Sequence, residues 1–166
     1  MGNDLYIGAP NGIVLCVDSL NQMGCSGRFY HSYQTDPVRF RTLGEMLFRM
    51  EAFFDELNYP RRGNTDRHFV DTGPIALAKP QRISEKGEKV MADKELLGHH
   101  GKAETFIVRV QHRQNNTWQG RITWADKNKT LNFRSIWEMV HLMEDAIYEN
   151  APPEEVPETQ SWEEES

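Results

Sequence analysis

Hydrophobic and polar positions of the chain follow the same pattern twice, 93 residues apart. The segment "FRTLGEMLFRME" begins at Phe40 and the segment "FRSIWEMVHLME" begins at Phe133. Over residues 13–56 and 106–149, ten of 44 aligned positions are identical, and hydrophobic residues match at most of the other patterned sites. The chain is therefore predicted to contain an internal duplication.

Each of the two segments predicts the start of a helix. Thr42 and Ser135 are good N-cap residues, and Glu45 and Glu138 follow three positions later. This spacing is that of a capping box, in which the hydroxyl and the carboxylate satisfy backbone amides reciprocally. Apolar residues then recur three and four positions apart, which predicts an amphipathic helix of about four turns in each copy.

Three predicted strands precede each helix. The alternating segments "IVLCV" and "FIVRV" form the first strand, "GRFYHSY" and "GRITWAD" the second, and "VRF" and "LNF" a short third. Polar turn segments, "SLNQMGCS" and "QNNTWQ", separate the first two strands. The order is β-β-β-α in both copies. We expect an α+β fold in which the duplicated units form a pseudo-twofold body, with an antiparallel sheet and two amphipathic helices.

Four segments follow from this pattern. The first β-β-β-α repeat covers residues 1–58, a connecting segment without a repeat covers 59–105, the second repeat covers 106–150, and an acidic tail covers 151–166. Within the connecting segment, "EKVMADKELLGHHG" predicts one short helix that ends near Gly98. We expect part of this segment to order against the repeats, because a long structureless loop inside a compact domain is unusual.

The net charge of −6 belongs to the C-terminal tail. Residues 151–166 contain six glutamates and no lysine or arginine, so 19 acidic and 19 basic side chains remain in the preceding residues. The tail has the composition of a solvated, mobile segment. Its Trp162 stands among glutamates, which is typical of a short motif that docks an aromatic anchor beside basic residues. The tail could bind a partner or fold back on the arginines of its own chain, and an inert solubilising tail is the alternative.

Alternation along the strands predicts a candidate binding surface rich in arginine. If Phe106, Val108 and Val110 face the helix, the intervening side chains point to the other sheet face. The residues expected on or beside that face are Arg109, Gln111, Arg113, Arg121 and Arg134 in the second repeat, and Arg28, Tyr30 and Arg41 in the first. Such a surface could hold phosphates and stack on bases. Alternatively, the arginines pair with carboxylates of the other repeat or of the connecting segment.

Other chemistry finds little support in the chain. Cys16 and Cys25 are expected to be reduced thiols, with a single disulfide between them as the alternative. No histidine or cysteine spacing predicts a metal site, and we expect no cofactor. No segment resembles a phosphate loop or a nucleophile elbow, so we expect no enzyme and no catalytic residue. Trp118 and Trp124 are expected to be packing residues.

The second repeat resembles a group of proteins in its local segments. "VRVQHRQNNTWQGRITW" followed by "FRSIWEMVHLMEDAI" is similar to uncharacterised short proteins of Gram-positive bacteria, in which Trp-Gln-Gly and Phe-Arg-Ser segments occur in this order. The first repeat departs from the pattern, with Cys25-Ser26 where the second has Trp118-Gln119. The resemblance carries over no functional residue. The β-β-β-α order is also similar in topology to HicB-type antitoxins.

Two functional hypotheses follow. The first is a non-catalytic bacterial binding or regulatory protein that presents the arginine-bearing sheet face to nucleic acid or a nucleoprotein. The second is an accessory protein of a phage or mobile element that inhibits a host defence nuclease by protein contact. We expect a cytoplasmic protein without a membrane partner, because no stretch is apolar enough to span a bilayer. The pattern favours no particular oligomeric state.

Overall fold

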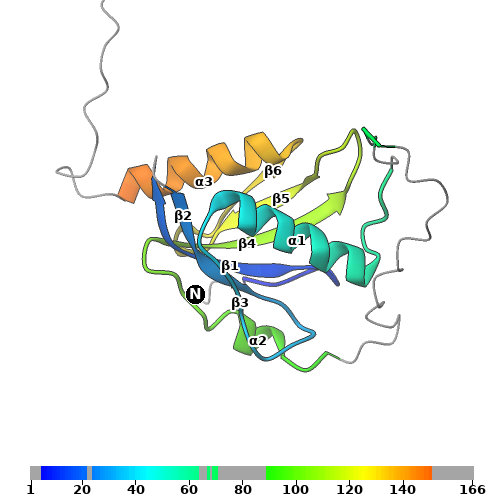
Figure 1. Ribbon diagram of the computed structural model, residues 1–166. Coiled ribbons are helices and arrows are strands. Elements are labelled where there is room, and N and C mark those ends of the chain that lie inside the picture. Colours follow the sequence, from blue (N-terminus) through cyan, green and yellow to red (C-terminus); the bar gives the residue numbers. More distant parts are fainter. Residues whose placement is uncertain (1–4, 22–23, 64–66, 68, 71–88, 151–166) are drawn as a thin grey trace, which may run out of the picture.

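The computed structural model describes residues 5–21, 24–63, 67, 69–70 and 89–150. Its elements are β1 (Ile13–Asn21), β2 (Gly24–Tyr30), β3 (Val38–Phe40), α1 (Leu43–Leu57), α2 (Asp93–Leu96), β4 (Glu104–His112), β5 (Gln119–Trp124), a 3₁₀ turn (Ala125–Lys127), β6 (Lys129–Phe133) and α3 (Ile136–Asn150). Six strands form one antiparallel sheet in the order β3-β2-β1-β4-β5-β6 (Figure 1). The predicted α+β class and the β-β-β-α order of both halves are confirmed. The acidic tail and its Trp162 lie outside the described residues.

Both long helices begin at the predicted caps. The Thr42 hydroxyl accepts a hydrogen bond from the Glu45 backbone N–H at 3.0 Å, and the Ser135 hydroxyl accepts one from the Glu138 N–H at 3.1 Å. The Glu45 carboxylate accepts from the N–H of Arg41 at 3.3 Å. In the predicted capping box, the Glu45 carboxylate would accept from the backbone N–H of the cap residue, Thr42. It accepts instead from the N–H of the preceding residue, Arg41, and so still satisfies a backbone donor at the start of the helix.

The two long helices cover one face of the sheet. Helix α1 contacts β2 and β3, whereas α3 contacts β4, β5 and β6, so each helix covers one half (Figure 1). The helix stripes and the inward side chains of the strands form the main core, with Phe29, Phe54, Phe106, Met46 and Met139 among its fully buried members. Burying a side chain of this size contributes about 1.5–3 kcal/mol, so this layer accounts for much of the stability.

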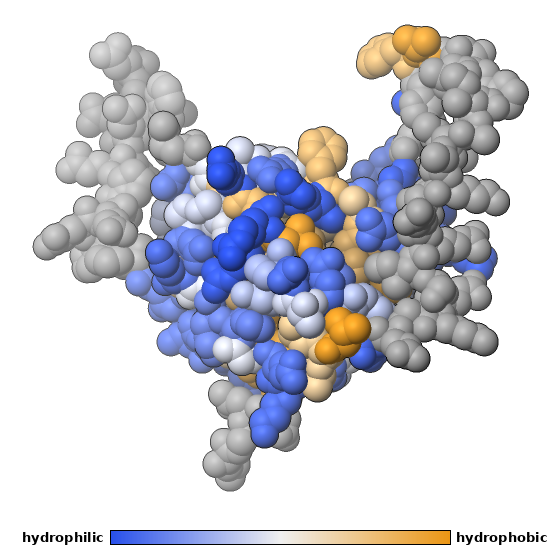
Figure 2. All heavy atoms as spheres, turned by 60° about the horizontal axis from the view of Figure 1, so that its bottom comes forward, coloured by the Kyte–Doolittle hydropathy of each residue, from blue (hydrophilic) through white to orange (hydrophobic). Residues whose placement is uncertain are grey.

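A second, smaller core covers the middle of the opposite sheet face. Residues 5–12 and the segment around α2 pack there; the buried side chains are Ile7, Val14, Cys16, Tyr30, Met91, Leu96 and Ile107. The predicted short helix is confirmed as α2, which ends before Gly98. Seen from the α2 side, the surface is mainly hydrophilic with small separate hydrophobic patches (Figure 2). The expectation of an open face is therefore wrong for the centre of the sheet.

A β-bulge interrupts the alternation of β4. Val110 pairs with Gly120 and His112 pairs with Gln119, so Gln111 is an extra residue in β4. Across from the bulge, a Cβ atom on Gly120 would lie 2.0 Å from the Arg109 carbonyl oxygen, so only glycine fits this position. Residues after the bulge point to the face opposite to the one that simple alternation predicts.

The first hairpin is longer than the sequence predicts. The pattern places a loop at "SLNQMGCS", but β1 runs to Asn21 and β2 begins at Gly24. The hydroxyls of Ser19 and Ser26 form a hydrogen bond of 2.7 Å across this extension. Cys25 belongs to the main core and Cys16 to the smaller one, and both are free thiols. The alternative of a disulfide between them is wrong, because the two thiols lie on opposite faces of the sheet.

Candidate functional site

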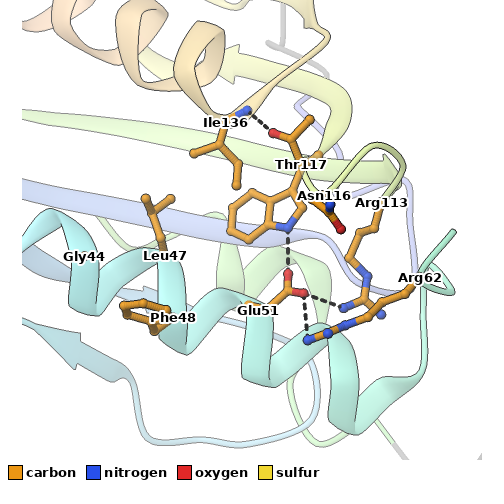
Figure 3. Close-up of a pocket in the computed structure, with 10 residues that line it drawn as sticks. Gly44, Leu47, Phe48, Glu51, Arg62, Arg113, Asn116, Thr117 and Ile136 are labelled. Atoms are coloured by element: carbon orange, nitrogen blue, oxygen red, sulfur yellow. Dashed lines mark hydrogen bonds and ion pairs between the residues drawn. The ribbon is translucent and has the colours of Figure 1, made fainter. Parts of the chain in front are cut away.

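A groove opens between the two long helices at the end of the β4–β5 hairpin. Its volume is about 440 Å³, and it is lined by Gly44, Leu47, Phe48, Glu51, Arg62, Arg113, Asn116, Thr117, Trp118 and Ile136 (Figure 3). The four lining residues of α1 are spaced three and four positions apart, which places them on one helix face. The other wall comes from the hairpin and the first residue of α3.

The hairpin wall is fixed to the start of α3. The Thr117 hydroxyl accepts a hydrogen bond from the backbone N–H of Ile136 at 2.8 Å, and so satisfies a donor at the helix N-terminus. The Trp118 ring meets the Phe54 ring edge-on, with centroids 5.3 Å apart. These contacts hold the apolar part of the groove, formed by Leu47, Trp118 and Ile136, in one geometry.

The polar end of the groove is organised by the carboxylate of Glu51. One oxygen, Oε2, accepts a hydrogen bond of 2.6 Å from the indole N–H of Trp118. The other oxygen, Oε1, lies 3.2 Å from Nη1 of Arg113 and 3.1 Å from Nη2 of Arg62 (Figure 3). Both oxygens of this carboxylate are therefore engaged by groups of the chain itself.

Arg113 is the centre of a buried ion-pair cluster. Its side chain is only 4% exposed, and it lies 2.7 Å from Asp55 as well as contacting Glu51. Its Nε donates to the carbonyl oxygen of Pro60 at 2.7 Å. Arg62 also binds Asp55, at 2.8 Å. Two arginines and two carboxylates thus neutralise one another and hold the chain after α1 against the hairpin.

Each of the two long helices has an exposed aromatic side chain, and the one on α1 lines the groove. Phe48 on α1 lines it and is 78% exposed, and Trp137 follows the lining residue Ile136 and is 75% exposed. The Trp137 ring meets the ring of His141 edge-on at 5.0 Å, one turn further along α3. A large aromatic side chain at the exposure of Phe48, in an apolar groove, marks a surface suited to contact with another molecule.

Arg109 is used inside the fold. Its Nη1 donates to the backbone carbonyl of Tyr6 at 2.8 Å, and its Nη2 donates to the Thr123 hydroxyl at 2.8 Å. The guanidinium also lies over the Tyr6 ring, 5.0 Å from its centroid. Burial lowers the pKa of Arg109 from its ordinary value. This arginine ties the N-terminal segment to the sheet and is not presented to solvent.

The predicted arrangement of four arginines on one open face is wrong. Arg109 points to the face that residues 5–12 cover, whereas Arg113 contacts carboxylates of α1 on the helix side. The cause is the bulge at Gln111, which reverses the alternation after Val110. Gln111 itself is exposed.

The other two arginines of the second half are exposed. Arg121 in β5 pairs with Arg109 in β4 on one side and with Asn132 in β6 on the other. Its exposed side chain lies on the part of this sheet face that residues 5–12 do not cover. Arg134 lies beyond β6, and its side chain is 88% exposed and 3.5 Å from Glu138. Arg121 pairs with Arg109 across β4 and β5, whereas Arg113 contacts α1 on the helix side of the sheet, so the structure does not gather the four arginines at one site.

The candidate residues of the first half are mostly engaged. Arg28 donates to the Tyr30 hydroxyl at 2.9 Å and lies 3.4 Å from a carboxylate oxygen of Asp18. The Tyr30 ring is buried and stacks on the His99 ring with centroids 3.6 Å apart. Arg41 is exposed. Of this group only Arg41 presents its side chain freely.

Both hairpin tryptophans have a carboxylate partner that the sequence did not predict. Trp118 donates to Glu51, and Trp124 donates to Glu104 at 2.7 Å. The position of Glu51 four residues after Leu47 could have shown that its carboxylate lies at the edge of the apolar stripe. Desolvation raises the pKa of Glu104, whose side chain also accepts from Asn150 at the end of α3. Both rings pack against the main core as expected, and each indole N–H also donates a hydrogen bond to a glutamate.

Comparisons with protein-family models, with curated proteins and with solved structures found no match to this chain. In the described part of the chain no three His, Cys, Asp or Glu side chains gather as a metal site would require, and no helix there is long and apolar enough to cross a membrane. The resemblance to proteins of Gram-positive bacteria and to HicB-type antitoxins stays a prediction.

Proposed function

We propose that the chain is a non-catalytic binding protein that contacts a protein partner through the groove between α1 and α3. The observation that carries the proposal is the apolar groove lined by the exposed side chain of Phe48. Aromatic side chains are enriched at protein interfaces and among the residues that dominate binding energy. The partner inserts an apolar side chain against Leu47, Trp118 and Ile136.

The polar end of the groove supports a binding role over a catalytic one. The Glu51 carboxylate is the acid group nearest the apolar wall, and both its oxygens already accept from Trp118, Arg62 and Arg113. A general base accepts a hydrogen bond from its substrate, whereas three of the acceptor positions of this carboxylate are taken by the chain itself. The cluster instead supplies a rigid, neutral boundary that fixes the shape of the groove.

Substitution at the groove rim tests the proposal. The partner is co-purified from the source organism with the wild-type chain, and its affinity is then measured by calorimetry for Phe48→Asp and for Tyr148→Asp. Tyr148 is an exposed aromatic on α3 that does not line the groove, so it is a matched control. We expect Phe48→Asp to weaken binding at least about tenfold, or about 1.4 kcal/mol, with Tyr148→Asp near wild type. Equal affinities for both variants would overturn the proposal.

Contact with nucleic acid or a nucleoprotein is the second candidate, carried by the arginines that stay exposed. Arg121 lies beside Asn132 on the open part of the sheet, and Arg41 and Arg134 follow the short edge strands. Anisotropy of a labelled single-stranded oligonucleotide, measured over a range of salt concentrations, tests it. Binding should weaken linearly on logarithmic axes, and Arg121→Met should reduce the slope by about one. Absence of binding at low salt would remove this candidate.

We also infer that the two halves descend from one duplicated β-β-β-α unit and form a pseudo-twofold body. β1 and β4 each carry a bulge at equivalent positions, 93 residues apart. Opposite these bulges stand Gly27 and Gly120, whose Cβ atoms would lie 2.1 and 2.0 Å from the carbonyl oxygens of Cys16 and Arg109. These two carbonyls are also 93 residues apart, so the same steric requirement recurs in both halves.

The pairing of the central strands supports the same inference. Val14 in β1 pairs with Ile107 in β4, its own counterpart in the duplication, as a twofold axis at this point requires. The strand order is the same when counted from either edge toward the centre. Met46 and Met139 are both fully buried under their respective helices.

A further inference from the structure

Strand β6 forms an exposed edge of the sheet. Within the described residues it pairs only with β5, and its residues from Lys129 to Asn132 are exposed. The backbone N–H and C=O groups on its outer side are therefore open to another strand. The opposite edge, β3, is only three residues long and offers a shorter template.

An apolar pocket of about 230 Å³ opens beside this edge, between the sheet and α3. It is lined by Phe106, Ile122, Trp124, Lys129, Leu131, Leu142, Asp145, Ala146 and Glu149. Leu131 pairs with Ile122, which belongs to the main core, so the Leu131 side chain lies on the helix side of the sheet. That side chain is 46% exposed, which leaves apolar surface at the pocket mouth uncovered.

The edge and the pocket fit one extended ligand. A strand added to β6 alternates its side chains between the two sheet faces. Every second side chain would therefore stand beside Leu131, over the pocket and next to α3. Main-chain pairing with an edge strand supplies affinity in this mode, and a pocket for alternate side chains supplies specificity.

Charges on the pocket rim set the chemistry of that ligand. Asp145 and Glu149 line the α3 side, and the last turn of α3 contains no basic residue. The C-terminal end of a helix also carries a partial negative charge. A lysine or arginine two positions from the inserted apolar side chain would point to the same face and meet these acids. Lys129 lines the strand side of the pocket and would repel a basic side chain of the ligand near it. The lysine or arginine of the ligand is therefore most favourably placed on the α3 side.

We propose that β6 and this pocket bind an extended segment of a partner protein, added as a seventh strand, that carries an apolar side chain and a lysine or arginine two residues away. The proposal is independent of the groove between α1 and α3, because the pocket shares no lining residue with that groove. Its ligand is recognised by the backbone edge, the apolar pocket and the two acids together.

Selection of peptides on the full chain provides the test. A phage library of random short peptides is selected on the immobilised protein, and the enriched peptides are titrated in solution by fluorescence anisotropy. We expect the enriched sequences to share an apolar residue and a basic residue two positions apart. Leu131→Lys should weaken binding at least about tenfold, because it places a charge at the pocket mouth.

Matched variants separate this site from others. Asn132→Lys adds the same charge to the neighbouring position on the opposite sheet face, and Phe48→Asp disrupts the other groove; both should bind the peptide within about twofold of wild type. Asp145→Lys should weaken it. The proposal would be overturned if no peptide were enriched, or if the enriched peptides lacked the apolar and basic pair. It would also be overturned if Leu131→Lys bound the peptides as tightly as the wild-type chain. A wild-type dimer in ultracentrifugation that becomes monomeric in Leu131→Lys would assign the edge to a second copy and would overturn it too.

Discussion

Replacing Arg113 by methionine tests whether the arginines of this chain build the fold or meet a partner. Methionine keeps most of the aliphatic stem but removes the guanidinium. Glu51, Asp55 and the carbonyl of Pro60 then lose a donor that lies 2.7–3.2 Å away from them. The variant leaves two carboxylates beside an apolar side chain, with Arg62 as their remaining cation.

The expected loss follows from the burial of the pair. Breaking a fully buried ion pair costs about 3–5 kcal/mol. The Arg113 side chain is 4% exposed, but Glu51 and Asp55 are 28% and 29% exposed and keep part of their hydration. The free energy of unfolding should therefore fall by roughly 2–3 kcal/mol. Arg121→Met removes an exposed guanidinium and should change it by less than about 0.5 kcal/mol.

Urea unfolding, followed by far-ultraviolet circular dichroism, measures both variants. The indole N–H resonance of Trp118 gives a second signal, because this N–H donates to the carboxylate that Arg113 holds in place. In a double-mutant cycle, Arg113→Met and Glu51→Gln should show a coupling of about 0.5–3 kcal/mol. If Arg113→Met and Arg121→Met shifted the unfolding midpoint equally, the buried cluster would not support the fold as argued.

Three further outcomes follow from the structure. Gly120→Ala and Gly27→Ala should each lower the free energy of unfolding by about 3 kcal/mol. Gly44→Ala places its methyl on a helix at an ordinary contact distance, 4.0 Å from the Thr42 hydroxyl oxygen, and should raise it by about 0.5–1 kcal/mol; similar values for all three in urea melts would contradict this. Burial lowers the pKa of His31 to about 4, because the buried ring favours its neutral form. The contribution of this histidine to the free energy of unfolding is therefore complete above about pH 6.5. It is lost as the pH falls toward about 4, by up to about 3 kcal/mol. A His31→Gln variant should show a flatter stability profile between these pH values. Burial raises the pKa of both thiols to about 11, so a thiol-disulfide reagent should react with the native chain far more slowly than with the unfolded chain.

Local signals explain why the elements could be predicted from the sequence. The caps at Thr42 and Ser135 and the helix stripes depend on residues only three or four positions apart. Strand alternation is equally local, and it correctly assigned Phe106 and Val108 to the helix side. The bulge at Gln111 left no such local signal, because it depends on how β4 meets Gly120 across the sheet.

The candidate site depended on contacts between distant segments, which the pattern alone does not give. Arg109 is covered by the backbone of Tyr6, more than a hundred positions earlier in the chain. Arg113 finds its partners on α1, near Asp55. The sequence identified both arginines as unusual and weighed pairing within the chain as an alternative. That alternative describes Arg113, which contacts Glu51 and Asp55. Arg109 is held instead by the Tyr6 carbonyl and the Thr123 hydroxyl. Arg121 and Arg134 stay exposed.

The groove between α1 and α3 is the surface that we propose receives an apolar side chain of the partner. Titration of the ¹⁵N-labelled full chain with indole, as a probe of aromatic side chains, tests this most directly by nuclear magnetic resonance. We predict saturable shifts of the Trp118 indole N–H and of the Ile136 amide, reduced in Leu47→Asp. Shifts confined to residues outside the groove, or no shift at these two groups, would contradict the account.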